Sequence, residues 1–296
     1  MKPLLVVCMI AFVRADFLFA QDVRQNIRSD KRPDPSAVEA AARLFPFHPI
    51  TTWTGKRFIF LPKPKSSRGG DYEDFSGKIS HEKYAGRIAR VVAVNDFNGR
   101  AHVEFEMEDT GEHLRAQTVV NKESLKGMAL ADDLENARKQ WAGKTLWCRM
   151  SMISTYDEQS DTLSPLRVKK YSPLKIIDVV SGWDETKPVR FQLETADGKR
   201  GFLDMNMSGT NVQKDLRYSS GFDEHLLTAD PRLKYKWPAH IWKSIEKAEI
   251  VSGMTAEQVK MSWGEPEKIA RTAAVEQWTY PGGTLLLKNG ILIGTQ

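Results

Sequence analysis

The sequence predicts a mainly β protein in which one small all-strand unit occurs twice and is followed by a tail of mixed helices and strands. Two segments resemble each other at a spacing of 86 to 88 residues, and apolar residues alternate with polar ones along both. After Pro238 the apolar spacing becomes helical and then returns to alternation. A chain of 296 residues is long enough for about two ordinary domains, or for three small ones.

The repeat begins with a tryptophan, glycine and lysine pattern, W-T-G-K at residues 53–56 and W-A-G-K at residues 141–144. A strand-like run follows each pattern, and two alternating apolar strands come next in both copies. The matched apolar residues are Ile88, Val91, Ala93, Val94, Val103, Phe105 and Met107 in the first copy, and Leu174, Ile177, Val179, Val180, Val189, Phe191 and Leu193 in the second. Such alternation is typical of half-buried antiparallel strands, so each copy is expected to form a small β-barrel or sandwich of about five strands.

Each copy resembles the SH3-like modules of bacteria, entered through its W-x-G-K strand. We expect one SH3-like β-barrel over residues 46–128, and a linking helix with a second barrel over residues 129–215. The helix is predicted by the helical spacing of Leu130, Leu134, Ala137 and Trp141, which places one apolar stripe on the second barrel. Little periodicity marks residues 205–237, which suggests a long linker lying on the surface. Residues 216–237 are assigned as the linker between the second barrel and the tail.

The tail, residues 238–296, has the pattern of two helices followed by three strands. Pro238 suits the first turn of a short helix, and Thr255 with Gln258 forms a capping box for a second one. The strands are expected at residues 276–280, 285–287 and 291–293. An Asn-Gly turn joins the last two, which is the strongest short hairpin signal.

Two segments of the tail, GMTAEQVKMSWGEP and EQWTYPGGTLLLKNGIL, resemble the SmpA/OmlA (BamE-like) domain of bacterial envelope proteins. The residues that carry the likeness are Gly253, Met254, Thr255, Trp263, Gly264, Pro266, Trp278 and Tyr280. The resemblance implies a two-layer αβ module that makes protein contacts in the cell envelope without catalysis. From their residue types, these positions are expected to serve folding before ligand contact, because glycines permit special backbone angles and alternating aromatics face one side of a sheet.

The best-known relatives of that domain are small lipoproteins of the outer-membrane protein assembly machinery. This sequence departs from them, because Cys8 lies too early within the apolar N-terminal run to be a lipid acceptor. The closer comparison is with larger secreted proteins that carry the domain as an appendage.

The N-terminus has the composition of a signal peptide, expected over residues 1–20 with cleavage after Ala15 or Ala20. Its apolar run covers residues 4–13 and would make a helix of about 15 Å, too short for a hydrocarbon core of about 30 Å. A buried N-terminal strand is the alternative. Residues 21–45 are predicted to be a flexible lead with a short helix, and the product to be periplasmic or extracellular, with no transmembrane segment.

Charge gives little support to a nucleic-acid partner, and none is expected. The chain carries 43 basic and 38 acidic residues, a net charge of +5, whereas nucleic-acid binders show a dense basic face. The one notable basic run holds Lys63, Lys65 and Arg68 and is followed at once by acidic residues. We interpret it as a solvated loop, with an anion site as the alternative.

No catalytic motif stands out, so we expect no enzyme, no cofactor and no metal site. The six histidines are scattered, and the only conceivable metal group, His102 and His113 with Glu104 and Glu106, is better explained as a solvated hairpin face. Cys148 lies within an alternating strand pattern and is expected in the core. A hydrolase assembled from distant residues remains a further hypothesis.

Tryptophan is abundant, with eight in the chain. Trp53 and Trp141 begin strands and are expected in the core, whereas Trp147 and Trp183 are predicted to face outward or to lie in a loop and are the candidate binding residues. The sequence thus predicts a non-enzymatic envelope protein that binds another envelope protein or acts as a scaffold. The alternative is a cell-wall binding protein that holds peptidoglycan or another glycan on aromatic platforms of the barrels.

Overall fold

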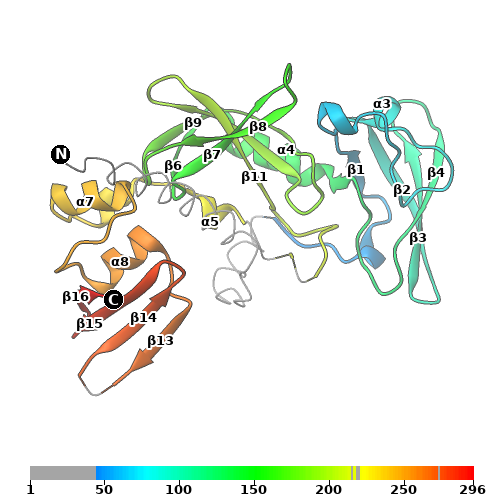
Figure 1. The fold of residues 1–296 in the computed structure, drawn as a ribbon. Coiled ribbons are helices and arrows are strands. Elements are labelled where there is room, and N and C mark those ends of the chain that lie inside the picture. The colour runs from blue at the N-terminus through cyan, green and yellow to red at the C-terminus, as the bar shows by residue number, and fades with distance from the viewer. Residues whose placement is uncertain (1–44, 215, 218–220, 273) are drawn as a thin grey trace, which may run out of the picture. The chain divides into compact units, whose positions relative to one another are not determined.

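The computed structural model describes residues 45–214, 216–217, 221–272 and 274–296. The predicted signal peptide and nearly all of the predicted lead and short helix therefore lie outside the described residues. The described chain is mainly β, with three antiparallel sheets and few helices, which confirms the predicted fold class at this level (Figure 1). It divides into two compact units, one with the described residues up to Lys234 and one with the described residues from Tyr235 on.

The first sheet has five strands in the order β4-β3-β2-β1-β5. The strands are β1 (Arg57–Phe60), β2 (Ile88–Phe97), β3 (Arg100–Met107), β4 (His113–Gln117) and β5 (Met128–Leu130). Short helices η1 (Ile50–Thr52), η2 (Lys65–Ser67) and α3 (His81–Tyr84) precede β1 or connect it to β2. Its core contains a cluster of aromatic rings. The centre of the Phe60 ring lies 4.9 Å from that of Tyr72 and 5.5 Å from that of Tyr84.

The second sheet has seven strands in the order β12-β6-β9-β10-β11-β7-β8. The strands are β6 (Thr145–Cys148), β7 (Met152–Asp157), β8 (Thr162–Arg167), β9 (Pro173–Ser181), β10 (Val189–Thr195), β11 (Arg200–Met205) and β12 (Leu226–Leu227). The helices of this part are α4 (Ala131–Trp141), α5 (Phe222–His225) and α6 (Pro231–Lys234). As predicted, α4 packs Leu134, Ala137 and Trp141 on the core of this sheet, whereas Leu130 belongs to β5 instead.

The two sheets share one strand order, which confirms the predicted repeat: β1-β2-β3-β4 in the first corresponds to β6-β9-β10-β11 in the second. Both W-x-G-K patterns form the same turn. Gly55 has a φ of 82° and its N–H donates to the Val91 carbonyl at 2.8 Å, while Gly143 has a φ of 79° and its N–H donates to the Ile176 carbonyl at 2.8 Å. This left-handed backbone is why glycine is required there.

The matched apolar residues of β3 and β10 are all buried, and Trp53, Trp141 and Cys148 are buried as predicted. One matched pair is wrong: Val91 is buried, but its predicted counterpart Ile177 is 38% exposed. Both sheets have a bulge on this strand, at Val92 in the first and at Ile177 in the second. The predicted match is therefore one residue out, and the counterpart of Val91 is the buried Ile176.

The repeats differ between their first two strands. The first repeat has η2 and α3 in that connection, whereas the second has the β7–β8 hairpin, so the prediction of about five strands per copy is wrong for the second. The predicted surface character of residues 205–237 is also wrong. Asn211 is 2% exposed and bonds to the backbone of Leu125 and Met128, and Leu226 pairs with Cys148 in the sheet.

The tail contains α7 (Ala239–Glu246), α8 (Ala256–Trp263) and a four-stranded sheet in the order β13-β14-β15-β16. The strands are β13 (Lys268–Arg271), β14 (Glu276–Tyr280), β15 (Gly283–Lys288) and β16 (Ile291–Thr295). The capping box of Thr255 and Gln258 is present. The predicted three strands are one too few, because every residue of the edge strand β13 is exposed and the strand has no alternating pattern to reveal it.

Candidate binding cleft between the repeats

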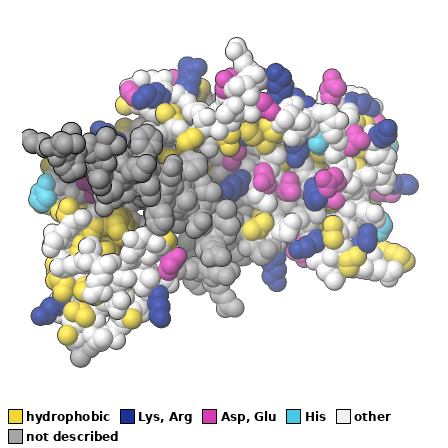
Figure 2. Space-filling model, viewed as in Figure 1, with side chains coloured by type: hydrophobic (Ala, Val, Ile, Leu, Met, Phe, Trp, Pro, Cys, Tyr) yellow, Lys and Arg dark blue, Asp and Glu magenta, His cyan; other side chains and the backbone are white. Residues whose placement is uncertain are grey.

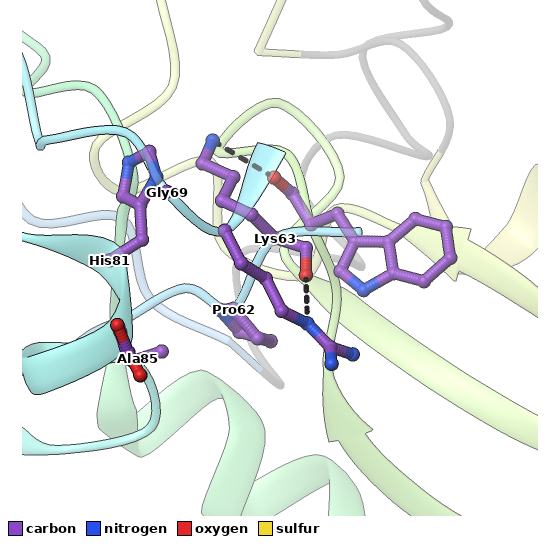
Figure 3. Close-up of a pocket in the computed structure, with 8 residues that line it drawn as sticks. Pro62, Lys63, Gly69, His81 and Ala85 are labelled. Atoms are coloured by element: carbon purple, nitrogen blue, oxygen red, sulfur yellow. Dashed lines mark hydrogen bonds between the residues drawn. The ribbon is translucent and has the colours of Figure 1, made fainter. Parts of the chain in front are cut away.

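A cleft of about 490 Å³ opens where the β1–β2 connection of the first repeat meets the loop between β9 and β10 of the second. Its lining residues are Pro62, Lys63, Arg68, Gly69, His81, Glu82, Ala85 and Trp183. Figure 3 shows Pro62, Lys63, His81 and Ala85 around the same hollow. All but Trp183 come from the β1–β2 connection, so the second repeat contributes a single aromatic side chain.

A smaller cavity of about 110 Å³ adjoins the cleft, and the two share Lys63 and His81. Its other lining residues are Asp71, Tyr72, Glu73, Lys126, Gly127 and Glu185. The cleft is lined by Lys63, Arg68 and Glu82 among charged groups, while the smaller cavity has three carboxylates beside Lys63 and Lys126. Over the face seen in Figure 2, Lys and Arg side chains are likewise interspersed with Asp and Glu.

The β7–β8 hairpin fixes the two repeats to each other beside the cleft. The Tyr156 hydroxyl donates to Asp161 Oδ1, and the Ser66 N–H of η2 donates to Asp161 Oδ2 at 2.9 Å. These donors, Tyr156 first, lower the pKa of the Asp161 carboxyl group because they stabilise its charged form. The Lys65 N–H also donates to the Tyr156 hydroxyl oxygen, at 3.2 Å.

Trp183 is half-buried and its ring is held in place from several sides. The Arg190 guanidinium lies 3.8 Å from the centre of the indole and 3.7 Å from that of the Phe202 ring. Arg190 is itself fixed by two hydrogen bonds of 2.7 Å to Asp204, and the Tyr156 ring meets the indole edge-on at 4.7 Å. The indole thus enters the cleft wall as a pre-oriented surface.

His81 is 9% exposed and its tautomer follows from its contacts. Its Nδ1 lies 3.0 Å from the Ser67 carbonyl oxygen, which can only accept, so Nδ1 carries the proton. In the neutral ring Nε2 is then the acceptor. Tyr72 packs edge-on against the imidazole at 4.4 Å and holds its plane. Sequence reasoning missed His81, because nothing near it in the sequence has a ligand-like spacing.

The basic run is only partly the solvated loop that its sequence suggested. Lys63 is half-buried, and its Nζ donates to the Trp183 carbonyl oxygen at 3.3 Å, as the dashed line in Figure 3 marks. Arg68 Nε donates to the Lys63 carbonyl oxygen at 3.4 Å, and its guanidinium pairs with Glu158 at 2.9 Å. Lys65 is exposed.

The structure separates the two candidate binding residues. Trp183 lines the cleft, whereas Trp147 is half-buried on β6, opposite Pro173 and Leu227. A platform formed by both tryptophans together is therefore not what the fold builds. The sequence indicated the accessible position of Trp183 through its place in a predicted loop. It did not indicate the contact with Lys63, which comes from a distant part of the sequence.

The eight residues behind the SmpA/OmlA resemblance make contacts within the tail. Gly253 N–H donates to the Leu292 carbonyl at 2.9 Å, and Leu292 N–H donates to the Met254 carbonyl at 2.8 Å, so this turn covers the outer edge of β16. Thr255 caps α8, Gly264 ends it with a φ of 86°, and Pro266 is buried after it. Trp278 is buried, the Tyr280 hydroxyl donates to the Gly264 carbonyl at 3.0 Å, and Trp263 Nε1 donates to the Ala248 carbonyl at 2.8 Å.

No group of three or more His, Cys, Asp or Glu in the described part of the chain is placed to hold a metal ion, including the hairpin of His102 and His113. Nor does any helix there have the length and apolar character that crossing a membrane requires. No known protein family, curated protein or solved structure matches the chain.

Proposed function

We propose that this is a non-enzymatic binding protein of the bacterial cell envelope, periplasmic or extracellular, which holds an envelope protein in the cleft between its repeats. The proposal includes the finer architecture, two SH3-like modules followed by a BamE-like domain. The common strand order of the repeats and the helix pair with its antiparallel sheet support that architecture.

The observation that carries the proposal is the pre-oriented cleft. Trp183 is fixed by Arg190, His81 is fixed by Ser67, and Lys63 lies between them with its ammonium bonded to a neutral carbonyl. A ligand that meets such groups does not have to order them, so less conformational entropy is lost on binding. An apolar wall with a few oriented polar groups is also the usual composition of a ligand site.

Site-specific photo-crosslinking in intact cells tests this function. A photoreactive amino acid at Ala85, an exposed residue that lines the cleft, is expected to give a discrete adduct with an envelope protein. The same amino acid at Lys139, exposed on α4, serves as the matched control and is expected to give none. Equal labelling from both positions, or an adduct confined to cytosolic proteins, would contradict the proposal.

A second function, binding of a cell-wall polymer, is favoured by the indole in the cleft wall, because aromatic rings form platforms for the apolar faces of sugars. Co-sedimentation with purified sacculi tests it. Trp183→Leu is expected to reduce the sedimented fraction, and Trp147→Leu, at the other half-buried tryptophan of this sheet, is expected to leave it unchanged. A wild-type protein that stays in the supernatant at every wall concentration would exclude this function.

A further inference from the structure

We propose that the cleft recognises the free C-terminal carboxylate of a polypeptide, anchored by Lys63 Nζ and His81 Nε2. The inference rests on the proposed function and specifies the chemistry of the ligand. It starts from two side chains that lie at the junction of the cleft and the smaller cavity, since these are the two lining residues that both share.

The first anchor is a lysine whose charge is not neutralised at contact distance. An ammonium has three donors, and within the described part of the chain Lys63 Nζ uses one of them on a neutral acceptor, the Trp183 carbonyl. Lys126, on the smaller cavity, provides the contrast, because its Nζ pairs with Glu73 at 2.5 Å. Of the two lysines at this place, Lys63 is the one that has no paired carboxylate among the described residues, and hydrogen bonds to ionised groups are the strong ones.

The second anchor is His81. With the Nδ1 proton directed to Ser67, the remaining polar atom of its buried ring is Nε2. Protonation of the neutral ring at Nε2 would make it a charged donor without disturbing the bond to Ser67. A carboxylate has two oxygens, so one can accept from Lys63 Nζ and, when both ring nitrogens carry a proton, the other can accept from His81 Nε2.

The surroundings select a single terminal carboxylate over a polyanion. On the cleft side, Pro62, Ala85 and the Trp183 ring give an apolar part of the wall, which suits the side chain or backbone next to the carboxylate. Arg68 and Glu82 also line the cleft, one with each sign of charge. On the far side of Lys63 and His81, the carboxylates of Glu73 and Glu185 would repel a second negative group. A cleft of about 490 Å³ has room for a few residues, which fits the end of a chain.

The test measures binding of a fluorescein-labelled Leu-Ala-Ala peptide to the full-length protein by fluorescence polarisation. The free acid is expected to bind, and the same peptide with a C-terminal amide is expected to bind at least tenfold more weakly, since the amide cannot form charge-assisted bonds. Lys63→Met and His81→Asn, whose amide can still donate to Ser67, are each expected to weaken binding of the free acid by about tenfold or more.

Three controls make the result decisive. Lys139→Met removes an exposed lysine of α4 that lines neither cavity and is expected to change the affinity less than twofold. Lys63→Arg keeps the positive charge and is expected to retain binding. The comparison of the free acid with the amide uses the wild-type protein, so its outcome does not depend on whether a variant folds. Equal binding of acid and amide, or an unchanged affinity of Lys63→Met, overturns the inference.

Soluble peptidoglycan fragments, with and without carbodiimide amidation of their carboxylates, identify the source of the carboxylate. Binding of these fragments alone, with no binding of the peptide up to millimolar concentration, would overturn the assignment to a polypeptide terminus. A crosslink from Ala85 that persists in Lys63→Met would leave the proposed function standing and defeat only the carboxylate inference. Absence of any crosslink would defeat the function itself.

Discussion

Replacing Asp133 with Asn is expected to change how the stability of the repeat unit depends on pH. Asp133 lies in the first turn of α4, is 3% exposed, and accepts hydrogen bonds from the Ser208 hydroxyl at 2.6 Å and the Ser208 N–H at 3.2 Å. Burial raises the pKa of its carboxyl group to about 7, although the Ser208 bonds act in the opposite direction. The positive end of α4 also favours the charged form, but by only about 1 kcal/mol or less.

The sign follows from the raised pKa. The folded state binds a proton that the unfolded state has already released, so Asp133 contributes stability that is fully present below pH 3.8 and is lost as the pH rises through about 7. The difference between 3.8 and about 7 corresponds to about 4 kcal/mol.

His225 produces the opposite slope. It is 5% exposed, both of its ring nitrogens lack a hydrogen-bond partner among the described residues, and burial, with Lys187 and Arg149, lowers its pKa to about 4. Its neutral form is favoured in the folded state, so stability is lost as the pH falls from 6.5 to about 4, by about 3 kcal/mol. Between these values the slopes of Asp133 and His225 nearly cancel in the wild-type protein.

Single variants should separate the two slopes. On acidification from pH 6.5 to 4, Asp133→Asn is expected to lose about 3 kcal/mol relative to wild type, and His225→Leu to gain about 3 kcal/mol. The double variant should again follow the wild type. Hydrogen exchange of the β10 amides, compared with wild type at each pH, reports the opening free energy of this unit, and the expected rate ratios exceed about a hundredfold.

If Asp133→Asn and wild type kept a constant ratio of exchange rates from pH 4 to 6.5, the buried carboxyl group would not be titrating as argued. A constant ratio for His225→Leu would refute the argument for the imidazole in the same way.

Three further substitutions test contacts and turns that hold separate elements of the fold together, and hydrogen exchange of backbone amides measures the effect of each. Asn211→Ala leaves buried backbone groups unpaired, and at a φ of 64° it also adds backbone strain, so the β5 region should lose at least about 2 kcal/mol. Asp161→Ala removes the oxygen that accepts from the Ser66 N–H. The Ser66 amide should then exchange faster, while the exchange rates of the β10 amides stay the same. Gly253→Ala, at a φ of 85° with open space around it, should destabilise β16 by about 1 kcal/mol, whereas Gly294→Ala, where space is equally open and φ is not in the left-handed region, should cost less.

Much of the strand framework could be predicted, because alternation and self-comparison both depend on local residue order. Val103 and Phe105 repeat in Val189 and Phe191, and all four are buried. The bulge at Ile177 could not be predicted, since a bulge is set by the pairing of two strands rather than by either one. Asp133 lies in the first turn of α4, where acidic residues commonly face solvent, and the contact with Ser208 from 75 residues away in the sequence accompanies its burial.

The cleft illustrates why repeat analysis finds cores more readily than sites. Self-comparison reveals positions that both copies share, and these are the W-x-G-K turns and the buried strands. The cleft lies where the copies differ: Lys63 and His81 belong to the β1–β2 connection, and the β7–β8 hairpin, at the equivalent place in the second copy, holds η2 through Asp161. The two copies thus share one strand order but differ in the connection between their first two strands. The cleft forms beside these differing connections, so neither copy would form it alone.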